Sequence, residues 1–367
     1  MSRLPDAVDG EWVLGVDSGG SGMRVALARR SVPGAEGAPR DALTFECAEP
    51  VRTGPAGIDP DHMAGQLIPA VRRLLEDAGA PGARLAAVCV GAAGMVTLGE
   101  ALRARLPGAL AGAFDVRRIG LAADAVTAYA GALGERPGAV VAAGTGVIAM
   151  GTDLRTWRRA DGWGHLLGDC GSGAWIGRAG LEAAMRAHDG REGGSAALRE
   201  RAEAVFGGSL NHLPGQLYPR TDRPAVLASF APEVAGCAAR DPVAAGILRT
   251  AAAEIVASAA AVCPGGVEGA ERHAGTAVGA GAAGPGDGAT VAFTGGLFRL
   301  GEPLMEPLRG ELVERLPLAR VVEAAGDPLD GAVVIADRLA EGRLALPATP
   351  PLLTRVDATS QQPTATY

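Results

Sequence analysis

An apolar run, a short glycine-rich turn and a second apolar run occur twice in this chain, and the repeat constrains the fold more than any other feature. The first copy is VLGVDSGGSGMRVALA (13–28) and the second is GAVVAAGTGVIAMGT (138–152). Each copy predicts a β-hairpin, because glycine permits a tight turn between two buried strands. With 367 residues, 48% of them hydrophobic, the chain is long enough to fill the cores of two domains.

Around these hairpins, apolar runs of strand length alternate with stretches of helical spacing. This alternation predicts an α/β fold with a largely parallel sheet. Residues 264–288 are rich in Gly and Ala without periodicity and predict a flexible insertion, and the tail 343–367 is expected to be disordered. The expected strands outside the second hairpin are 12–17, 23–29, 41–49, 84–94, one within 114–125, 289–298 and 320–322. The expected helices are 61–77, 99–105, 125–133, 172–188, 303–315 and 328–339, with 195–263 mainly helical.

Composition excludes several classes of function. The formal net charge is −7 and the pI is near 5.4, so no positive field attracts nucleic acid or an anionic membrane. No apolar run approaches the roughly 20 residues that span a bilayer, and the first ten residues lack the apolar core of a signal peptide. A cytoplasmic protein that acts on a small molecule is therefore expected, with neither nucleic acid nor membrane as a partner. The chain has no lysine, which excludes a Walker-type lysine and a Schiff base.

Two patterns are rejected as functional motifs. The five cysteines, at positions 47, 89, 170, 237 and 263, are odd in number and form no CxxC pair, so they signal neither a disulfide framework nor a cysteine metal site. Gly279, Gly281 and Gly284 spell G-x-G-x-x-G, but no strand precedes them and no helix follows. They are therefore not interpreted as a dinucleotide fingerprint.

Asp17 ends an apolar strand directly before the small-residue run Ser18–Gly22. A carboxylate at such a place is costly without a partner, and magnesium bound to a carboxylate and to nucleotide phosphates is a suitable one. The glycine-rich turn would let backbone N–H groups approach a phosphate. An Asx-turn at Asp17 and a turn that only closes the hairpin are the alternatives. The second turn and a further Gly-Gly at 295–296 favour phosphate binding.

Two further aspartates carry either chemistry or a helix cap. Asp124 follows a strand and opens a helix, so it is either a capping residue or a general base for a substrate hydroxyl. Asp169 lies in the glycine-rich stretch DGWGHLLGDCGSGAWIG (161–177), where it either caps the next helix or accepts hydrogen bonds from sugar hydroxyls. His165 has no second His or Cys at metal-ligand spacing, which favours a buried or substrate-orienting role.

Five segments together resemble one known family. GVDSGGSGMRVAL, GLAADAVTAYAGAL, AAGTGVIAMG, GWGHLLGDCGSGAWIG and FTGGLF occur in the order of the phosphate-1, catalytic, phosphate-2, sugar-site and adenosine segments of the BadF/BadG/BcrA/BcrD ATPase family. Over residues 12–340 the chain is similar to the N-acetylglucosamine kinase branch, within the sugar kinase, Hsp70 and actin superfamily. The resemblance implies two ribonuclease-H-like domains, 1–122 and 123–342, with a cleft between them. It also implies ATP, Mg²⁺ and phosphorylation of N-acetylglucosamine to its 6-phosphate.

The resemblance implies a role for each matched residue. Asp17 would organise the magnesium, and Asp124 would accept the proton of the sugar hydroxyl. The implied ATP-binding residues are Gly19, Gly20, Ser21, Gly144, Thr145, Gly146, Gly295 and Gly296. The implied sugar-binding residues are Gly57, Asp124, Thr145, Gly164 and Asp169.

Three positions depart from the family pattern. Gly57 stands where an Asn commonly contacts the sugar, Cys170 replaces the Glu of Gly-Asp-Glu-Gly, and Ser21 stands where Thr is common. Because the sugar-reading positions have changed, glucosamine and N-acetylmuramic acid stay open as acceptors. A reductase-activating ATPase with an iron–sulfur cluster is disfavoured by the sequence context of the cysteines, and a non-catalytic sugar sensor is disfavoured by Asp124. Homodimer formation is also left open.

Overall fold

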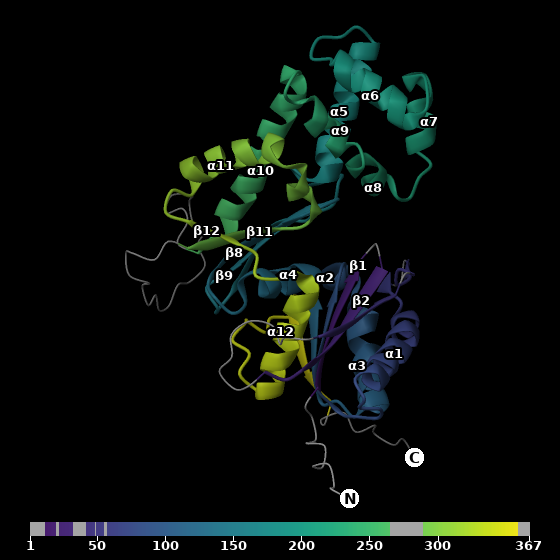
Figure 1. The fold of residues 1–367 in the computed structure, drawn as a ribbon, viewed down its shortest axis with the longest axis vertical. Helices are drawn as coiled ribbons and strands as arrows, with labels where there is room; N and C mark the ends of the chain where they lie inside the picture. Colours follow the sequence, from purple (N-terminus) through teal and green to yellow (C-terminus); the bar gives the residue numbers. More distant parts are fainter. Residues whose placement is uncertain are drawn as a thin grey trace, which may run out of the picture. The chain divides into compact units, whose positions relative to one another are not determined.

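The computed structural model describes residues 12–19, 22–31, 42–47, 49–54, 57–264 and 289–358. They form two compact units (Figure 1). Unit 1 comprises Met1–Arg136, Leu154–Trp157 and Ala324–Tyr367, and unit 2 comprises Pro137–Asp153 and Arg158–Glu323. Each unit is built around a β-sheet with helices packed against it, so the expected α/β class is confirmed.

The sheet of unit 1 starts from the first hairpin. Strands β1 (Trp12–Gly19), β2 (Gly22–Arg29) and β3 (Leu43–Cys47) pair antiparallel in sequence order. On the other side of β1, β6 (Leu85–Ala92) and β7 (Arg118–Ala123) add in parallel. The order β3-β2-β1-β6-β7 is the one expected of a ribonuclease-H-like domain.

Unit 2 repeats this order from the second hairpin. Here β8 (Gly138–Ala143) pairs antiparallel with β9 (Val147–Thr152), and β10 (Trp157–Asp161) lies beyond β9. β11 (Thr290–Thr294) adds parallel to β8, and β12 (Arg320–Glu323) adds parallel to β11. The two glycine-turn hairpins therefore occupy equivalent positions in two similar sheets, as the sequence repeat predicts.

Helices cover both faces of the unit 1 sheet (Figure 1). α1 (Pro60–Asp77) packs on β2, β3 and α3 (Glu100–Phe114). α12 (Pro328–Glu341) packs on the opposite face against β1, β6 and β7, beside α4 (Asp124–Leu133). The remaining elements of this unit are short: β4 (Thr53–Gly54), β5 (Gly57–Ile58) and α2 (Met95–Leu98).

The helical part of unit 2 packs on α5 (Gly173–His188) and α10 (Pro242–Val262). Apolar side chains from both helices form one core with β8 and β9, which includes Ile176, Leu181, Leu248 and Ile255. The other elements are α6 (Ala196–Phe206), η1 (Leu210–His212), α7 (Leu213–Leu217), α8 (Arg223–Ala228), α9 (Ala231–Cys237), η2 (Gly296–Leu300) and α11 (Glu302–Arg315).

Helix α10 corrects one sequence expectation. It has 21 residues and a mean hydropathy of 1.4 over its most apolar window, so by length and composition it is the one described helix that could cross a membrane. The sequence analysis found no run of that length, because Arg249 and Glu254 interrupt the apolar residues. The helix continues past both charged residues, because Leu248, Ile255 and Val262 are buried in the core of unit 2 and hold it there.

The C-terminal part of the chain also differs from expectation. Residues 324–358 belong to unit 1 rather than to the second domain or a disordered tail, and α4 belongs to unit 1 as well. β13 (Leu353–Asp357) pairs antiparallel with β7, and the Trp157 indole N–H donates to the carbonyl of Pro347 at 2.8 Å. The expected boundary at 122/123 and the tail beginning at 343 are corrected accordingly. The expected insertion at 264–288 lies almost wholly outside the described residues.

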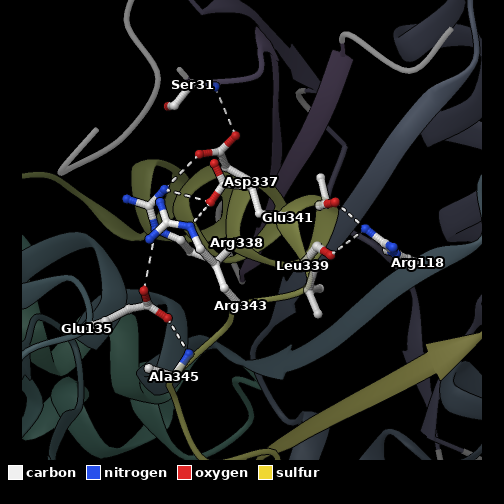
Figure 2. A network of polar contacts seen from close by, with 10 residues as sticks. Ser31, Arg118, Glu135, Asp337, Arg338, Leu339, Glu341, Arg343 and Ala345 are labelled. Atoms are coloured by element: carbon white, nitrogen blue, oxygen red, sulfur yellow. Dashed lines mark hydrogen bonds and ion pairs between the residues drawn. The ribbon is translucent and has the colours of Figure 1, made fainter. Parts of the chain in front are cut away.

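A buried charge cluster holds this segment in place (Figure 2). Arg338 lies within 3.4 Å of Glu135, 3.0 Å of Asp337 and 3.5 Å of Glu341. Asp337 is fully buried and also accepts the backbone N–H of Ser31 at 3.0 Å, and Glu135 accepts that of Ala345 at 2.6 Å. Because a buried charge is costly without partners, these contacts fix the end of α12 and the chain after it.

Helices α4 and α12 approach closely through glycine. A Cβ at Gly331 of α12 would overlap the carbonyl oxygen of Thr127 in α4, and a Cβ at Gly131 would overlap the carbonyl oxygen of Asp327. We expect Gly331→Ala to lower the free energy of unfolding by at least about 2 kcal/mol, because neither backbone can move aside in the packed interior. The measurement is the urea unfolding midpoint.

Gly310→Ala is the matched control, because Gly310 also lies inside a helix, α11, but no atom lies within 4 Å of the place that its Cβ would take. That variant should be stabilised by about 0.5–1 kcal/mol through helix propensity alone. Equal effects at the two positions would contradict the close approach.

Candidate active site

Three parallel strands in unit 1 end at the same edge of the sheet. Ser18 of β1 lies opposite Ala92 of β6, and Ala92 lies opposite Ala123 of β7. Asp17 precedes the first of these positions and Asp124 follows the last. With strands about 4.8 Å apart, the two aspartates sit at one sheet edge separated by roughly 10 Å across two strand spacings. The unit therefore brings together the predicted metal-binding and catalytic residues.

Asp17 is held by an arginine that the sequence analysis did not single out. Arg24 lies opposite Asp17 in the β1–β2 ladder, and its guanidinium is 2.6 Å from Asp17 Oδ2 and 2.6 Å from Asp327 Oδ2. Burial lowers the pKa of Arg24, but hydrogen bonds to the two carboxylates outweigh it and raise the pKa overall. One cation thus links two carboxylates from β1 and the start of α12.

Asp327 also caps α12. Its Oδ1 accepts the backbone N–H groups of Leu329 at 2.8 Å and Asp330 at 3.1 Å, and the Asp330 side chain accepts the N–H of Asp327 in return. This is a reciprocal capping box, which satisfies backbone donors that a helix start leaves unpaired. Burial raises the pKa of Asp327, but the hydrogen bonds from Arg24 and from the backbone outweigh it and lower the pKa.

The donor set fits magnesium bound by few protein ligands. Among the residues that the structure describes, no three or more His, Cys, Asp or Glu side chains gather as a metal cage. Magnesium does not need one, because it binds through one or two carboxylates together with waters and substrate phosphates. Asp17 is partly exposed at the end of β1, which suits that mode of binding.

Asp124 is the first residue of α4 and does not occupy the N-cap position. Ala123 is the N-cap and makes no side-chain capping bond, while Asp124 Oδ1 accepts the N–H of Ala125 at 2.9 Å. The Asp124 side chain thus satisfies a backbone donor of the first turn, and this contact is compatible with both predicted roles, a helix-start residue and a general base.

The other predicted binding residues of unit 1 lie in the first glycine-rich segment and at Gly57. Gly19 ends β1 and pairs with Gly22, while Gly20 and Ser21 lie outside the described residues. Gly57 is buried in β5 with φ +97°, and a Cβ there would overlap the carbonyl oxygen of Leu98. This position therefore has no room for the Asn side chain that the family pattern carries.

In unit 2 the second glycine turn packs on the start of α5. The Gly144 N–H donates to the carbonyl of Gly146 at 2.8 Å and closes the turn. The N–H groups of Gly173 and Ala174 donate to the carbonyls of Gly144 and Thr145 at 2.9 and 3.0 Å. The turn is thereby fixed against the start of α5, and its carbonyls occupy the N–H groups of Gly173 and Ala174.

The loop that carries Asp169 reaches the same turn. A Cβ at Gly146 would lie 2.7 Å from Asp169 Oδ2, so the carboxylate contacts the turn directly. Asp169 Oδ1 accepts the N–H of Gly164 at 3.2 Å. Burial raises the pKa of Asp169, with a smaller upward contribution from the charge of Asp161, against hydrogen bonds from the backbone of Gly164 and Val147 and the charge of His165. Helix α5 is capped by Ser172 instead, so Asp169 is not its cap.

The third Gly-Gly lies beside this turn. β11 pairs with β8 up to Thr294 opposite Ala142, so Gly295 and Gly296 follow at the sheet edge where the turn begins. A Cβ at Gly295, which has φ +107°, would overlap the carbonyl oxygen of Ala143. Unit 2 therefore gathers five predicted segments at one edge: Gly144–Gly146, Gly164, Asp169, Gly295 and Gly296.

Sequence reasoning did not assign a role to Arg24, which binds Asp17, to Asp327, which binds Arg24, or to Asp161, whose carboxylate accepts the backbone N–H of Asp169. Arg24 was detectable in part, because the strand residue that faces Asp17 in the predicted hairpin is fixed by the register of the two strands. Asp327 carried a weaker signal, since Asp-Pro-Leu-Asp is typical of a helix start but gives no indication of its partner.

Comparison with known proteins gives one family. The family described as the BadF/BadG/BcrA/BcrD ATPase family matches residues 14–336, and the chain belongs to it. This range begins in β1 and ends inside α12, so it includes almost every described element of both units. The family resemblance expected from the sequence is confirmed.

Individual relatives point in the same direction. An N-acetylmuramic acid/N-acetylglucosamine kinase from Clostridium acetobutylicum is 27% identical over 185 residues, 49% of this chain and 56% of that protein, so the match spans about half of each. A solved structure of a candidate N-acetylglucosamine kinase from Chromobacterium violaceum is 26% identical and covers 90% of this chain and 99% of that one, with a TM-score of 0.63. A second candidate N-acetylglucosamine kinase, from Porphyromonas gingivalis, is 18% identical over 90% and 99% with a TM-score of 0.62, and shows a shared fold.

The lowered pKa of Asp327 predicts how its charge contributes to stability. A carboxylate whose folded pKa is lowered stabilises the protein above its ordinary pKa, and this contribution is lost as the pH falls through the folded value. Asp327→Asn keeps a capping side chain but removes the charge. We expect it to reduce the free energy of unfolding at pH 7 by less than about 1 kcal/mol, because the Asp327 side chain is 47% exposed. This difference should shrink as the pH falls below the ordinary pKa of a carboxyl group.

The measurement is urea unfolding of both proteins from pH 7 to pH 3. Asp327→Ala serves as the control, since it also loses the cap and should remain destabilised by about 1 kcal/mol at every pH. A difference between wild type and Asp327→Asn that is the same at pH 7 and pH 3 would show that the ion pair with Arg24 contributes nothing.

Proposed function

Because the chain belongs to the BadF/BadG/BcrA/BcrD ATPase family, we propose that it transfers the terminal phosphoryl group of ATP to a hydroxyl of an amino sugar. The observation that carries this proposal is the contact in unit 2 between the Gly144–Gly146 turn and Asp169. A turn suited to phosphate and a carboxylate suited to sugar hydroxyls lie in one place, as a sugar kinase requires.

Each residue has a physical role in the proposed reaction. Asp124 accepts the proton of the attacking hydroxyl from its position in the first turn of α4. The glycine-rich turn at Gly144–Gly146 brings backbone N–H groups close to the phosphates, and Gly19, Gly20 and Ser21 are proposed for the same role on the family resemblance alone. Gly295 and Gly296 lie along the adenosine. Asp17 would hold magnesium, which when bound neutralises charge on the phosphoryl oxygens.

The acceptor we propose is N-acetylglucosamine, phosphorylated at its 6-hydroxyl. The relatives from Clostridium acetobutylicum and Chromobacterium violaceum support this class of sugar through their described activities. N-acetylmuramic acid is the second candidate, because the Clostridium relative is described as a kinase of both sugars. We place the reaction in the cytoplasm, where ATP is the available phosphoryl donor.

The cysteines do not favour the iron–sulfur alternative. Burial raises the pKa of the thiols of Cys89 and Cys263, the latter to about 11, and burial is also the main cause of the raised pKa values at Cys47, Cys170 and Cys237. Among the residues that the structure describes, none of these cysteines belongs to a group of three or more potential metal ligands.

The first test is ADP release with a panel of sugars at saturating ATP and magnesium. N-acetylglucosamine should give the highest kcat/KM, ahead of N-acetylmuramic acid, glucosamine, N-acetylmannosamine and glucose. Asp124→Asn should reduce kcat by about 10²–10⁴-fold, because the base is lost, while ATP binding measured by calorimetry stays close to that of wild type.

Asp61→Asn is the matched control for this test. Asp61 is an exposed aspartate in the first turn of another helix of unit 1, α1, where it pairs with Arg105 at 2.9 Å. Its substitution should leave kcat unchanged. Turnover by Asp124→Asn at the wild-type rate would remove Asp124 from the reaction, and ADP release that no sugar accelerates would overturn the proposed function.

The raised pKa of Asp169 predicts the acid limit of sugar binding. An ionised carboxylate accepts hydrogen bonds from sugar hydroxyls with both oxygens, and protonation removes part of that capacity. Because the pKa of Asp169 is above the ordinary value, the KM for the sugar should start to rise while the pH is still above the range in which an ordinary aspartate titrates.

The KM for sugar and the KM for ATP should be measured from pH 7.5 to pH 4.5. We expect the ATP value to change less, and Asp169→Asn to show a high KM for sugar with little pH dependence. A wild-type sugar KM that is constant over this range would contradict the assignment of Asp169 to the sugar.

A further inference from the structure

Asp161, the last residue of β10, uses its carboxylate to hold the backbone at Asp169. Its Oδ1 accepts the N–H of Asp169 at 2.6 Å, and its Oδ2 accepts the N–H of Cys170 at 2.8 Å. Hydrogen bonds from backbone N–H groups to an ionised carboxylate are stronger than those between neutral groups. The two bonds therefore close the loop 162–168 into a ring at its base.

The conformation of Asp161 itself is unusual for a residue with a side chain. Its φ is +60°, in the left-handed region that glycine adopts most easily and that Asp tolerates better than most residues. Asp169, at the other end of the loop, also has a positive φ of +54°. The loop thus begins and ends at strained positions, which persist only where surrounding contacts hold them.

Arg159 braces the start of the same loop. Its Nε donates to the carbonyl of Asp161 at 3.0 Å, and its guanidinium donates to the carbonyl of Gly162 at 2.5 Å and lies 4.3 Å from the ring centre of Trp163. At Gly168 a Cβ would lie 2.5 Å from Asp161 Oδ1. The loop is therefore packed tightly around the Asp161 carboxylate.

The two hydrogen bonds to the Asp161 carboxylate control the direction in which the Asp169 side chain points. The side chain of Asp169 contacts the Gly144–Gly146 turn on one oxygen and the N–H of Gly164 on the other. Both contacts depend on the backbone at 169 and 170, which is where the two bonds from Asp161 end. Movement of this backbone by a fraction of an ångström would turn the carboxylate away from the turn.

We propose that Asp161 is a positioning residue for the acceptor sugar: its carboxylate fixes the backbone of Asp169 and Cys170 and so aims Asp169 at the sugar hydroxyls. This inference rests on the proposed function for the role of Asp169. Asp161 does not touch the sugar and takes no part in phosphoryl transfer. Its loss therefore weakens the binding of sugar more than it slows the chemical step.

Two variants separate the carboxylate from the backbone conformation. Asp161→Gly keeps the positive φ without strain and removes both hydrogen bonds, and Asp161→Asn keeps one acceptor oxygen. Asp115→Gly is the matched control, because Asp115 also has a positive φ, of +48°, and pairs with Arg84 at 2.7 Å in unit 1.

The kinetic readout is the split between KM and kcat with the best acceptor of the sugar panel. Asp161→Gly should raise the KM for sugar by about 10–100-fold, the scale of effect that small misplacements in an active site produce. The KM for ATP and kcat should change by less than about 3-fold, as expected when binding alone is weakened. Asp161→Asn should lie between wild type and Asp161→Gly, and Asp115→Gly should match wild type.

The thiol of Cys170 supplies a second readout that needs no activity. Burial is the main cause of its raised pKa, the charges of Asp161, Glu254 and Asp169 also raise it, and the charge of Arg178 lowers it. Removing the Asp161 carboxylate should therefore lower this pKa and speed alkylation by iodoacetamide at pH 8. Peptide mass spectrometry resolves Cys170 from the buried Cys89, whose slow reaction should not change.

The outcomes are distinct. Faster alkylation of Cys170 in Asp161→Gly together with a raised KM for sugar supports the proposal. Faster alkylation with an unchanged KM overturns it, since Asp161 would then hold the loop without orienting the Asp169 carboxylate. An unchanged alkylation rate also overturns it. These results leave the proposed function standing if wild type phosphorylates a sugar. If wild type phosphorylates no sugar, the proposed function fails and the role of Asp161 in aiming Asp169 fails with it.

Discussion

In each unit the arrangement of the predicted site residues depends on one constraint, that parallel strands end at the same edge of a sheet. In unit 1 this constraint brings the ends of β1 and β7 to one edge, and with them Asp17 and Asp124. In unit 2 it brings the ends of β8 and β11 together, and with them Gly144 and Gly295. Strand pairing thereby brings segments that are far apart in the chain to the same edge of the sheet, even where the segments do not contact one another. Open α/β sheets bind ligands at this edge for that reason.

Helix α12 connects several features of unit 1 that are distant in sequence. Its capping residue Asp327 joins Asp17 through Arg24, and its first turns pack through Gly331 on α4, the helix that begins with Asp124. Its last turns carry the buried charge cluster around Arg338 (Figure 2). A single helix therefore supports two predicted site residues at one end and orders the C-terminal segment at the other.

Several elements show where local sequence patterns were insufficient to predict the bounds of a helix, a strand or a domain. The helix expected at 99–105 continues to Phe114, because Pro107 is buried with Leu106 and Leu110 and packing outweighs the break that Leu-Pro-Gly suggests. β13 has only five residues, and its pattern is too short to identify without knowing that β7 offers a free sheet edge. The expected domain boundary was wrong for a similar reason, because α12 belongs to unit 1 although the whole of Arg158–Glu323, which belongs to unit 2, precedes it in the chain.

The sequence by itself determined the α/β class and the two hairpins, and it supplied the predicted glycine and aspartate positions in each unit, because these depend on residue type and on spacing within short segments. Only the tertiary structure decided the partners of those residues. That Arg24 links Asp17 to Asp327, and that Asp161 holds the backbone at Asp169, are consequences of how separate segments pack. Side-chain contacts of this kind depend on position in three dimensions, and a local pattern carries no information about which distant residue will supply the partner.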